Sequence, residues 1–339
     1  MPLPTGDIVG LMVDNLERRS SVFPMSARKA TRWARGLGIP DGGETVLYTG
    51  AMYQLLPSIT AMVRLLERVE DSFLSRFVFL GRWANKVVNL SALAAHPSRA
   101  DVAHYAGVLR RIARLLQQAG IPFGYLYGDD MYAGALAYDS GVDGGFATHA
   151  RRVQAMLQRR GVRKLITVDP HTTNMLRSVY PEVLDGWDLE VKSYLEVLAA
   201  AGADPLQTVR RDVVIHDSCV YARYEGVIDE PRALLRDAGY RVNEPIFSRE
   251  QTFCCGGPIE ALFPSRAKEI GRRRLEQLQA AGGEGVVTMC PICLAALRTA
   301  AEGAIPVEDI SLFLAEAYCP ASPPRKGAGM PASVATDVG

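Results

Sequence analysis

Short apolar runs alternate with amphipathic stretches along most of the chain. Residues 145–160 carry apolar side chains at helical spacing, stop at a glycine and lead into an apolar run at 164–168. Residues 266–281 repeat this order, with a double-glycine stop and an apolar run at 285–289. Helical periodicity predicts helices, and short apolar runs bounded by glycine predict buried strands. Strands that alternate with helices predict an α/β fold with parallel sheets.

The two halves of the chain resemble each other, which predicts an internal repeat. Three pairs of segments carry the likeness: 45–51 with 213–219, 130–134 with 252–256, and 165–172 with 286–293. In this alignment the first copy has other residues where the second copy has cysteines: Ala51, Tyr132, Ala133, Asp169 and Thr172. The chain is therefore expected to consist of two pseudo-symmetric lobes, at residues 45–205 and 206–319.

The two ends of the chain differ from these lobes. Two amphipathic stretches, at 7–19 and 27–35, predict an N-terminal helical segment over residues 1–44, with Ser26 capping its second helix. The segment is rich in basic residues: Arg18, Arg19, Arg28, Lys29, Arg32 and Arg35. It is interpreted either as a solvated helical face or as a docking segment for a partner. Residues 320–339, rich in Pro, Gly, Ala and Ser, are expected to be disordered.

Composition excludes several classes of protein. The chain has 339 residues, 48% hydrophobic and 22% charged, which is typical of a globular protein of two domains. Its net charge of +1 gives no electrostatic basis for binding nucleic acid. No apolar run is long enough for a membrane span, and the N-terminus lacks the pattern of a signal peptide. A cytoplasmic location is expected.

Five of the six cysteines form one pattern. Cys219, the pair Cys254-Cys255 and the C-x-x-C pair Cys290 and Cys293 are separated by two intervals of 34 residues. Ligands of parallel sheets lie at the carboxyl ends of strands, so these loops are expected to converge. Thiolates select iron–sulfur clusters, zinc or copper(I), and five exceed the four that a structural zinc takes. An iron–sulfur centre is favoured over a disulfide framework, which is typical of small secreted chains.

The motifs that hold these cysteines resemble those of the CCG cysteine-rich domain family. The resemblance rests on residues 216–219 (HDSC), 254–258 (CCGGP) and 290–293 (CPIC). The family usually has Pro where this chain has Ser218. It includes the B subunit of heterodisulfide reductase and the iron–sulfur subunits of glycolate and lactate oxidases. Two Rossmann-like CCG lobes are implied.

The resemblance also implies a cofactor. One [4Fe-4S] cluster, of the non-cubane type, would be ligated by Cys219, Cys254, Cys255, Cys290 and Cys293. Gly256 and Gly257 would let the backbone approach sulfur and direct N–H groups toward it. The alternatives are a cubane cluster with a spare cysteine and a four-thiolate zinc site with a spare cysteine. The first lobe, without cysteines, is expected to hold no cluster.

Four residues are candidates for catalysis: Cys255, His216, His171 and Tyr132. His216 either donates a hydrogen bond to a cluster sulfide and carries a proton, or it only ends a strand. His171 and Tyr132 would lie in the vacated first lobe. There they would bind substrate, relay protons or simply fill space, and nearby carboxylates could also bind a divalent cation.

Two functions are compatible with these residues. The first is a heterodisulfide-reductase-like redox protein that acts on a small disulfide or a carrier-bound thiol. The second is a non-catalytic electron-transfer component of a glycolate- or lactate-oxidase-type dehydrogenase. A structural metal module is a third possibility. The chain has no ferredoxin-type cysteine run and no nucleotide-binding motif. A ferredoxin-type partner and a flavin-containing partner, similar to the C and A components of heterodisulfide reductase, are therefore expected to be separate chains.

Overall fold

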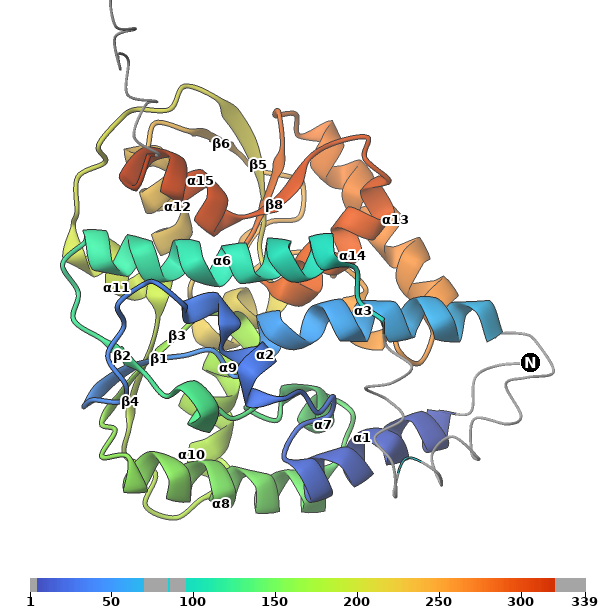
Figure 1. Ribbon diagram of the computed structural model, residues 1–339. Coiled ribbons are helices and arrows are strands. Elements are labelled where there is room, and N and C mark those ends of the chain that lie inside the picture. Colours follow the sequence, from blue (N-terminus) through green and yellow to red (C-terminus); the bar gives the residue numbers. More distant parts are fainter. Residues whose placement is uncertain (1–4, 70–84, 86–95, 321–339) are drawn as a thin grey trace, which may run out of the picture.

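The computed structural model describes residues 5–69, 85 and 96–320. It contains two four-stranded sheets, and all strand pairs in both sheets are parallel (Figure 1). The strands of the first sheet are β1 (Thr45–Tyr48), β2 (Gly124–Tyr125), β3 (Lys164–Thr167) and β4 (Glu190–Ser193). Those of the second are β5 (Asp212–His216), β6 (Arg241–Asn243), β7 (Val286–Thr288) and β8 (Val307–Asp309). The predicted α/β class with parallel sheets is confirmed.

Both sheets have the same topology. The first has the order β2-β1-β3-β4 and the second β6-β5-β7-β8, so each β-strand of one copy has a counterpart in the other. The segments aligned from sequence fall on counterpart strands, β1 with β5 and β3 with β7. Gly134 and Gly256 are also counterparts, and both have left-handed φ angles, of 95° and 84°. The internal repeat is therefore a repeat of structure.

Helices cover both sheets and connect their strands. Those of the first half are α1 (Thr5–Arg19), α2 (Ala27–Ala30), η1 (Arg32–Ala34), α3 (Met52–Val69), α6 (Arg99–Gln118), η3 (Tyr127–Asp129), α7 (Ala135–Asp139), α8 (Asp143–Arg159), α9 (Pro170–Asn174), η4 (Met175–Val179), α10 (Tyr180–Val183) and α11 (Tyr194–Ala201). Those of the second half are η5 (Tyr221–Glu225), α12 (Asp229–Asp237), η6 (Arg249–Gln251), η7 (Gly257–Ile259), α13 (Pro264–Ala280), α14 (Pro291–Ala301) and α15 (Ile310–Tyr318). Helices η4 and η5 are π-helical.

The N-terminal helices differ in part from the prediction. Helix α1 packs against α8, but the second predicted helix stops after Ala30 and continues as the short η1. The break lets Trp33 enter the core, where its indole Nε1 donates to the hydroxyl of Tyr125 at 3.3 Å. Arg110 of α6 donates to the carbonyl of Trp33 at 2.6 Å. Ser26 precedes α2, but its side chain makes no capping hydrogen bond.

One hydrophobic core runs through both halves of the chain. It includes Leu47 and Ile166 of the first sheet together with Val214 and Val287 of the second. Helix α6 crosses the front of the molecule in Figure 1 and packs against α3 of the first half and α15 of the second. A second apolar cluster lies on the other side of the first sheet, beneath α8 and α10. The two sheets are therefore held in a fixed relation by shared apolar packing.

Two tyrosines cross between the halves in a symmetric way. Tyr53 donates its hydroxyl proton to Oδ2 of Asp309 at 2.6 Å, and Tyr221 donates to Oγ of Ser193 at 2.9 Å. Tyr53 and Tyr221 are counterparts in the repeat, and so are Ser193 and Asp309, which cap α11 and α15. Each half thus extends one tyrosine side chain to the carboxyl edge of the sheet in the other half. The loops at these two edges consequently face each other.

Some predictions fall partly outside the described residues. The tail expected to be disordered begins at residue 320, and only its first residue is described. The lobe boundaries at 45–205 and 206–319 stay predictions, although the two sheets lie within them. Among the described helices, none combines the length and the apolar character required to cross a lipid bilayer.

Candidate metal centre

The structure brings together the five cysteines of the sequence pattern. Cys219 follows β5, Cys254 and Cys255 precede η7, and Cys290 and Cys293 lie at the start of α14. All are free thiols. Their side chains form a continuous series of hydrogen-bonding contacts in the order Cys219, Cys254, Cys255, Cys293 and Cys290. Three loops therefore converge on one compact group of sulfur atoms.

The sulfur atoms differ in burial and in protonation. Cys255, Cys290 and Cys293 are buried, whereas Cys219 and Cys254 are half-buried. Hydrogen bonds from the thiols of Cys219 and Cys255 lower the pKa of Cys254. Burial opposes ionisation of Cys290, but hydrogen bonds from Cys293 and His171 outweigh it and lower the pKa of Cys290 well below its ordinary value. Two of the five thiols thus favour the thiolate, which is the form that binds metal.

The double glycine after Cys255 shapes the loop around the sulfur atoms. The backbone N–H of Gly256 donates to Sγ of Cys254 at 3.3 Å, and that of Gly257 donates to Sγ of Cys255 at 3.4 Å. A Cβ at Gly256 would lie 2.6 Å from the carbonyl oxygen of Ala267, and one at Gly257 would lie 2.3 Å from Ile292. Only glycine fits at both positions. The expected approach of the backbone to sulfur is present.

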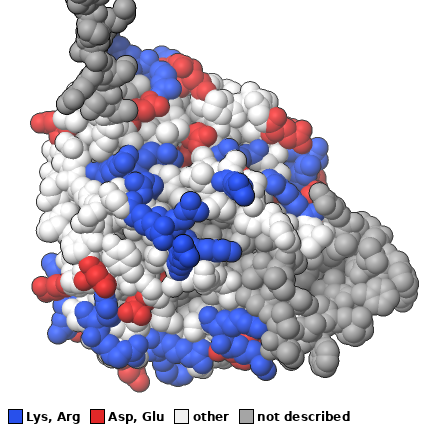
Figure 2. Space-filling view, in the orientation of Figure 1, with Lys and Arg blue, Asp and Glu red and all other residues white. Residues whose placement is uncertain are grey.

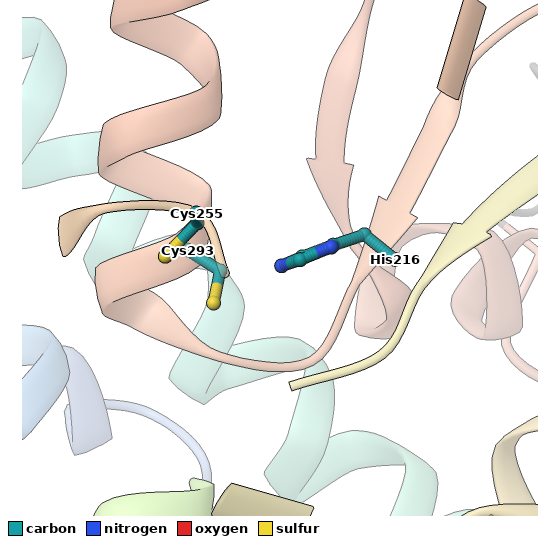
Figure 3. Close-up of side chains that lie close together, drawn as sticks. All are labelled: His216, Cys255 and Cys293. Atoms are coloured by element: carbon teal, nitrogen blue, oxygen red, sulfur yellow. The ribbon is translucent and has the colours of Figure 1, made fainter. Parts of the chain in front are cut away.

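His216 ends β5 and extends toward two of these cysteines (Figure 3). One of its ring nitrogens and the Sγ atoms of Cys255 and Cys293 all lie within 4.8 Å of one another. Nδ1 accepts a hydrogen bond from Nε of Arg274 at 3.0 Å, while the buried Nε2 has no hydrogen-bond partner among the described residues. Burial and the positive charge of Arg274 lower the pKa of His216 to about 3. The ring is therefore neutral at physiological pH.

Arg274 is a site residue that sequence reasoning missed. It is fully buried on α13, and its described hydrogen bonds go to neutral acceptors: Nδ1 of His216, the carbonyl of Phe247, Oε1 of Gln277 and Oγ1 of Thr252. Burial lowers the pKa of Arg274 to about 10, which leaves it cationic at neutral pH. A buried cation normally has an anionic partner. The carboxylate of Asp217 and, less strongly, the side chains of Cys293 and Cys255 favour the charged form of Arg274, although none of them is among its described hydrogen-bond acceptors.

The chemistry of these donors fits an iron–sulfur cluster. Such a cluster with its thiolate ligands is anionic, and thiolates hold it while hydrogen bonds to sulfur tune its potential. The site offers five thiols and two backbone N–H donors to sulfur, and beside them lie the buried cation of Arg274 and Nε2 of His216, which has no hydrogen-bond partner among the described residues. The only signal for Arg274 in the sequence is a run of three arginines, 272–274, of which one falls on the buried face of α13.

A second buried arginine holds the cysteine loops in place. Arg232 of α12 donates from Nη1 and Nη2 to the two carboxylate oxygens of Asp217 at 2.8 and 2.9 Å. Asp217 also accepts from the backbone N–H of Arg249 at 2.7 Å, and its carbonyl accepts from the hydroxyl of Thr252 at 2.9 Å. Asp217 lies next to the Cys219 loop and Thr252 next to the Cys254 loop. Asp217 and Arg232 thus form a buried ion pair between the two loops.

His171 reaches the cysteines from the other half of the chain. It lies in α9, is almost fully buried, and its Nδ1 is 3.3 Å from Oδ2 of Asp139. Its imidazole is also hydrogen-bonded to the side chain of Cys290. The hydrogen bonds to Asp139 and Cys290 raise the pKa of His171, although burial, the largest single effect, opposes them. The lobe without cysteines thus contributes a side chain to the cysteine site.

Several residues around the counterpart positions of the first lobe form hydrogen bonds within that lobe. Asp169 caps α9 by accepting from the backbone N–H of Thr172 at 3.0 Å, as Cys290 precedes α14 at the counterpart position. The hydroxyl of Tyr132 accepts from the backbone N–H of Leu136 at 2.6 Å. Asp130 accepts from the Tyr125 hydroxyl. Tyr132 is therefore engaged inside its own lobe and makes no described contact with the cysteines.

Asp129 is exposed, and its carboxylate lies 3.5 Å from the guanidinium of Arg160. Cys319, the sixth cysteine, is half-buried at the end of α15 and lies near Arg114. Cys319 takes no part in the described series of sulfur contacts.

Comparison with known proteins identifies the class of the second lobe. Residues 213–298 match the cysteine-rich domain called CCG, as the three cysteine motifs predicted. The chain is 32% identical over 222 residues to the EtfAB:quinone oxidoreductase of Syntrophomonas wolfei, which covers 62% of this chain and 31% of that protein. It is 30% identical over 192 residues to the probable iron-sulfur-binding oxidoreductase FadF of Bacillus subtilis, covering 55% and 27%.

A more distant likeness reaches the heterodisulfide reductases. The chain is 28% identical over 220 residues to the D subunit of the dihydromethanophenazine:CoB–CoM heterodisulfide reductase of Methanosarcina barkeri, covering 60% of this chain and 54% of that protein. The matched part spans between about a quarter and about half of the length of these relatives. The chain thus carries a CCG domain and is distantly homologous to the D subunit of heterodisulfide reductase and to FadF-type iron–sulfur oxidoreductases.

Proposed function

We propose that this protein is an iron–sulfur redox component of a heterodisulfide-reductase-like complex. Its second lobe would hold one [4Fe-4S] cluster, of the non-cubane type, through Cys219, Cys254, Cys255, Cys290 and Cys293. The observation that carries the proposal is the convergence of five free thiols beside a buried arginine whose described hydrogen bonds all go to neutral acceptors. A single zinc ion would leave at least one of these thiols without a role.

The site suits thiol–disulfide chemistry driven by single electrons. When bound, the cluster would supply one-electron transfer at a group of sulfur ligands. Reduction of one disulfide consumes two electrons and two protons and releases two thiols, so the electrons would come from a ferredoxin-type partner. Cys255 would serve both as ligand and in catalysis. His216 and His171 would act beside it, because one directs a ring nitrogen at the thiols and the other is hydrogen-bonded to Cys290.

A catalytic role for Tyr132 has less support. Its side chain is buried and its hydroxyl already accepts a hydrogen bond within the first lobe. The substrate would be a small disulfide or a carrier-bound thiol, and its route to the cysteines would begin at Cys219 and Cys254, the two that are only half-buried.

The partners are proposed to be a ferredoxin-type chain and a flavin-containing chain. Figure 2 shows Lys and Arg side chains gathered across the middle of one face, over α2, η1 and α6. The exposed basic residues of these elements include Arg28, Lys29, Arg32, Arg35 and Arg114. An acidic partner surface would be attracted to this face, which supports the docking role predicted for the N-terminal segment. We also propose that the complex of this protein with these partners is located in the cytoplasm.

A second function is favoured by a different observation. The relative from Syntrophomonas wolfei is named as a quinone oxidoreductase, and the one from Bacillus subtilis as an oxidoreductase that binds iron–sulfur. These names fit a protein that only passes electrons between a dehydrogenase partner, of the glycolate or lactate oxidase type, and another acceptor. In that case the cluster would be the same, but no disulfide would react at it.

Reoxidation by a disulfide separates the two functions. The protein, purified without air and reduced with dithionite, is mixed with 2-hydroxyethyl disulfide, and cluster absorbance and free thiol are followed. Each cluster gives up one electron, so two clusters together reduce one disulfide with the uptake of two protons, and we expect reoxidation with about one thiol released per cluster. A Cys319→Ser protein, changed away from the site, should behave identically. A cluster that stays reduced in the presence of the disulfide would contradict disulfide chemistry and leave the electron-transfer function.

A further inference from the structure

The hydrogen bond between Arg274 and His216 fixes where the imidazole carries its proton. A neutral imidazole has one N–H donor and one acceptor nitrogen, and a guanidinium has only donors. Nε of Arg274 lies 3.0 Å from Nδ1 of His216, so Nδ1 must be the acceptor. The proton is then on Nε2. This nitrogen is buried without a partner among the described residues, on a side chain that extends toward Cys255 and Cys293 (Figure 3).

The same hydrogen bond opposes ligation of a metal by His216. A histidine that binds metal through Nε2 carries its proton on Nδ1 and normally donates it to a carboxylate or a carbonyl. Here Nδ1 faces a cation, and ligation through Nε2 would place two N–H groups against each other at 3.0 Å. His216, Cys255 and Cys293 lie close enough together to form a three-ligand metal site. The hydrogen bond from Arg274, however, makes Nε2 of His216 a hydrogen-bond donor and not a metal ligand.

Arg274 is itself held firmly, which makes it suited to this role. It is fully buried, and Nη1 donates to the carbonyl of Phe247 at 2.9 Å and to Oε1 of Gln277 at 3.0 Å. The carbonyl of Phe247 belongs to the segment that leads to Cys254, and Gln277 lies one helical turn further along α13. The guanidinium therefore has little freedom to turn away from His216.

We propose that Arg274 is a positioning residue that locks His216 in the tautomer protonated at Nε2, so that His216 donates a hydrogen bond to a sulfur of the cluster and does not ligate iron. The proposal rests on the iron–sulfur function proposed above and assigns the chemistry of a residue within it. A hydrogen bond to sulfur stabilises the more negative, reduced cluster and raises its potential. His216 and Arg274 would therefore set the potential together.

Pulsed electron paramagnetic resonance of the reduced, full-length protein tests the proposal directly. A ligating imidazole gives a strong nitrogen hyperfine coupling, whereas a donor gives a coupling to a proton that exchanges in deuterated water. In the unaltered protein we expect the exchangeable proton and no strong nitrogen coupling. His216→Phe should retain its iron, lose the proton coupling and shift the reduction potential to a more negative value.

Variants of Arg274 separate positioning from a merely electrostatic effect. Arg274→Met should lose the proton coupling although His216 is present, and Arg274→Lys, which keeps a charged donor, should recover it. Arg273→Met, a change at an exposed neighbour on the same helix, should leave the proton coupling and the potential unchanged. The double variant of Arg274→Met and His216→Phe should show no further loss of proton coupling.

Two results would overturn the proposal in different ways. A strong nitrogen coupling in the unaltered protein, or loss of iron in His216→Phe, would show that His216 is a ligand while the iron–sulfur function stands. Absence of iron and sulfide from protein purified without air would overturn the proposed function and this inference with it. The measurement on the unaltered protein decides the question even if the arginine variants fail to fold.

Discussion

A Cys290→Ser variant purified without air is expected to lose most of its iron, its sulfide and its visible absorbance. Cys290 is buried immediately before the first residue of α14 and joins the series of sulfur contacts to His171 of the other half. A serine hydroxyl is a hard oxygen donor and does not replace a soft thiolate as a cluster ligand. The other thiols of the group already serve as ligands in this account, so we expect more than half of the cluster to be lost.

Matched controls show whether this loss is specific. Cys319→Ser changes a half-buried cysteine near Arg114, outside the group of five, and should keep the full cluster. Circular dichroism should show that both proteins keep their helices. A Cys290→Ser protein with the same iron and sulfide as the unaltered protein would contradict the assignment of Cys290 as a ligand.

Replacement of Arg232 by Met is expected to lower the free energy of unfolding by about 3–5 kcal/mol. The change leaves the buried carboxylate of Asp217 without its bidentate partner, and removal of one member of a buried ion pair is strongly destabilising. Arg241→Ala breaks a pair with Asp212 in which the arginine is 75% exposed, and should cost less than about 1 kcal/mol. Urea unfolding of the three proteins measures the difference.

A second change should restore part of that stability. Arg232→Met combined with Asp217→Asn removes the unpaired charge, so the double variant should be more stable than Arg232→Met alone. The double variant should also retain more cluster than Arg232→Met alone. The reason is that Asp217 connects the loops of Cys219 and Cys254 through Arg249 and Thr252. An Arg232→Met protein as stable as Arg241→Ala would show that the buried pair contributes little.

The positions of several strands were predictable because the physics behind them is local. Apolar runs that follow a glycine stop predicted β3 and β7 almost to the residue. The likeness between 45–51 and 213–219 predicted that β1 and β5 are counterparts. The second N-terminal helix was predicted too long, because Trp33 enters a core formed with Tyr125, a contact between residues distant in sequence.

The cysteines of the site could be identified from the sequence, whereas the residues that surround them could not. Thiol chemistry and spacing identified from sequence the five cysteines that converge. The sequence also placed Gly256 and Gly257 beside sulfur, but the atoms that exclude a Cβ there belong to Ala267 and Ile292. The roles of Arg274 and Arg232 depend on partners far along the chain, and an arginine in a helix is usually expected to be exposed. The contact of His171 with Cys290 depends on how the two halves face each other. No local pattern contains that information.

The content of iron, acid-labile sulfide and zinc in protein purified without air tests the central claim most directly. One lobe brings five thiols together, and the residues at the counterpart positions of the other offer none: Ala51, Tyr132, Ala133, Asp169 and Thr172. We therefore predict about four irons and about four sulfides per chain, with little zinc. About eight irons would show that the first lobe also holds a cluster. Zinc at full occupancy without sulfide would contradict the iron–sulfur site itself.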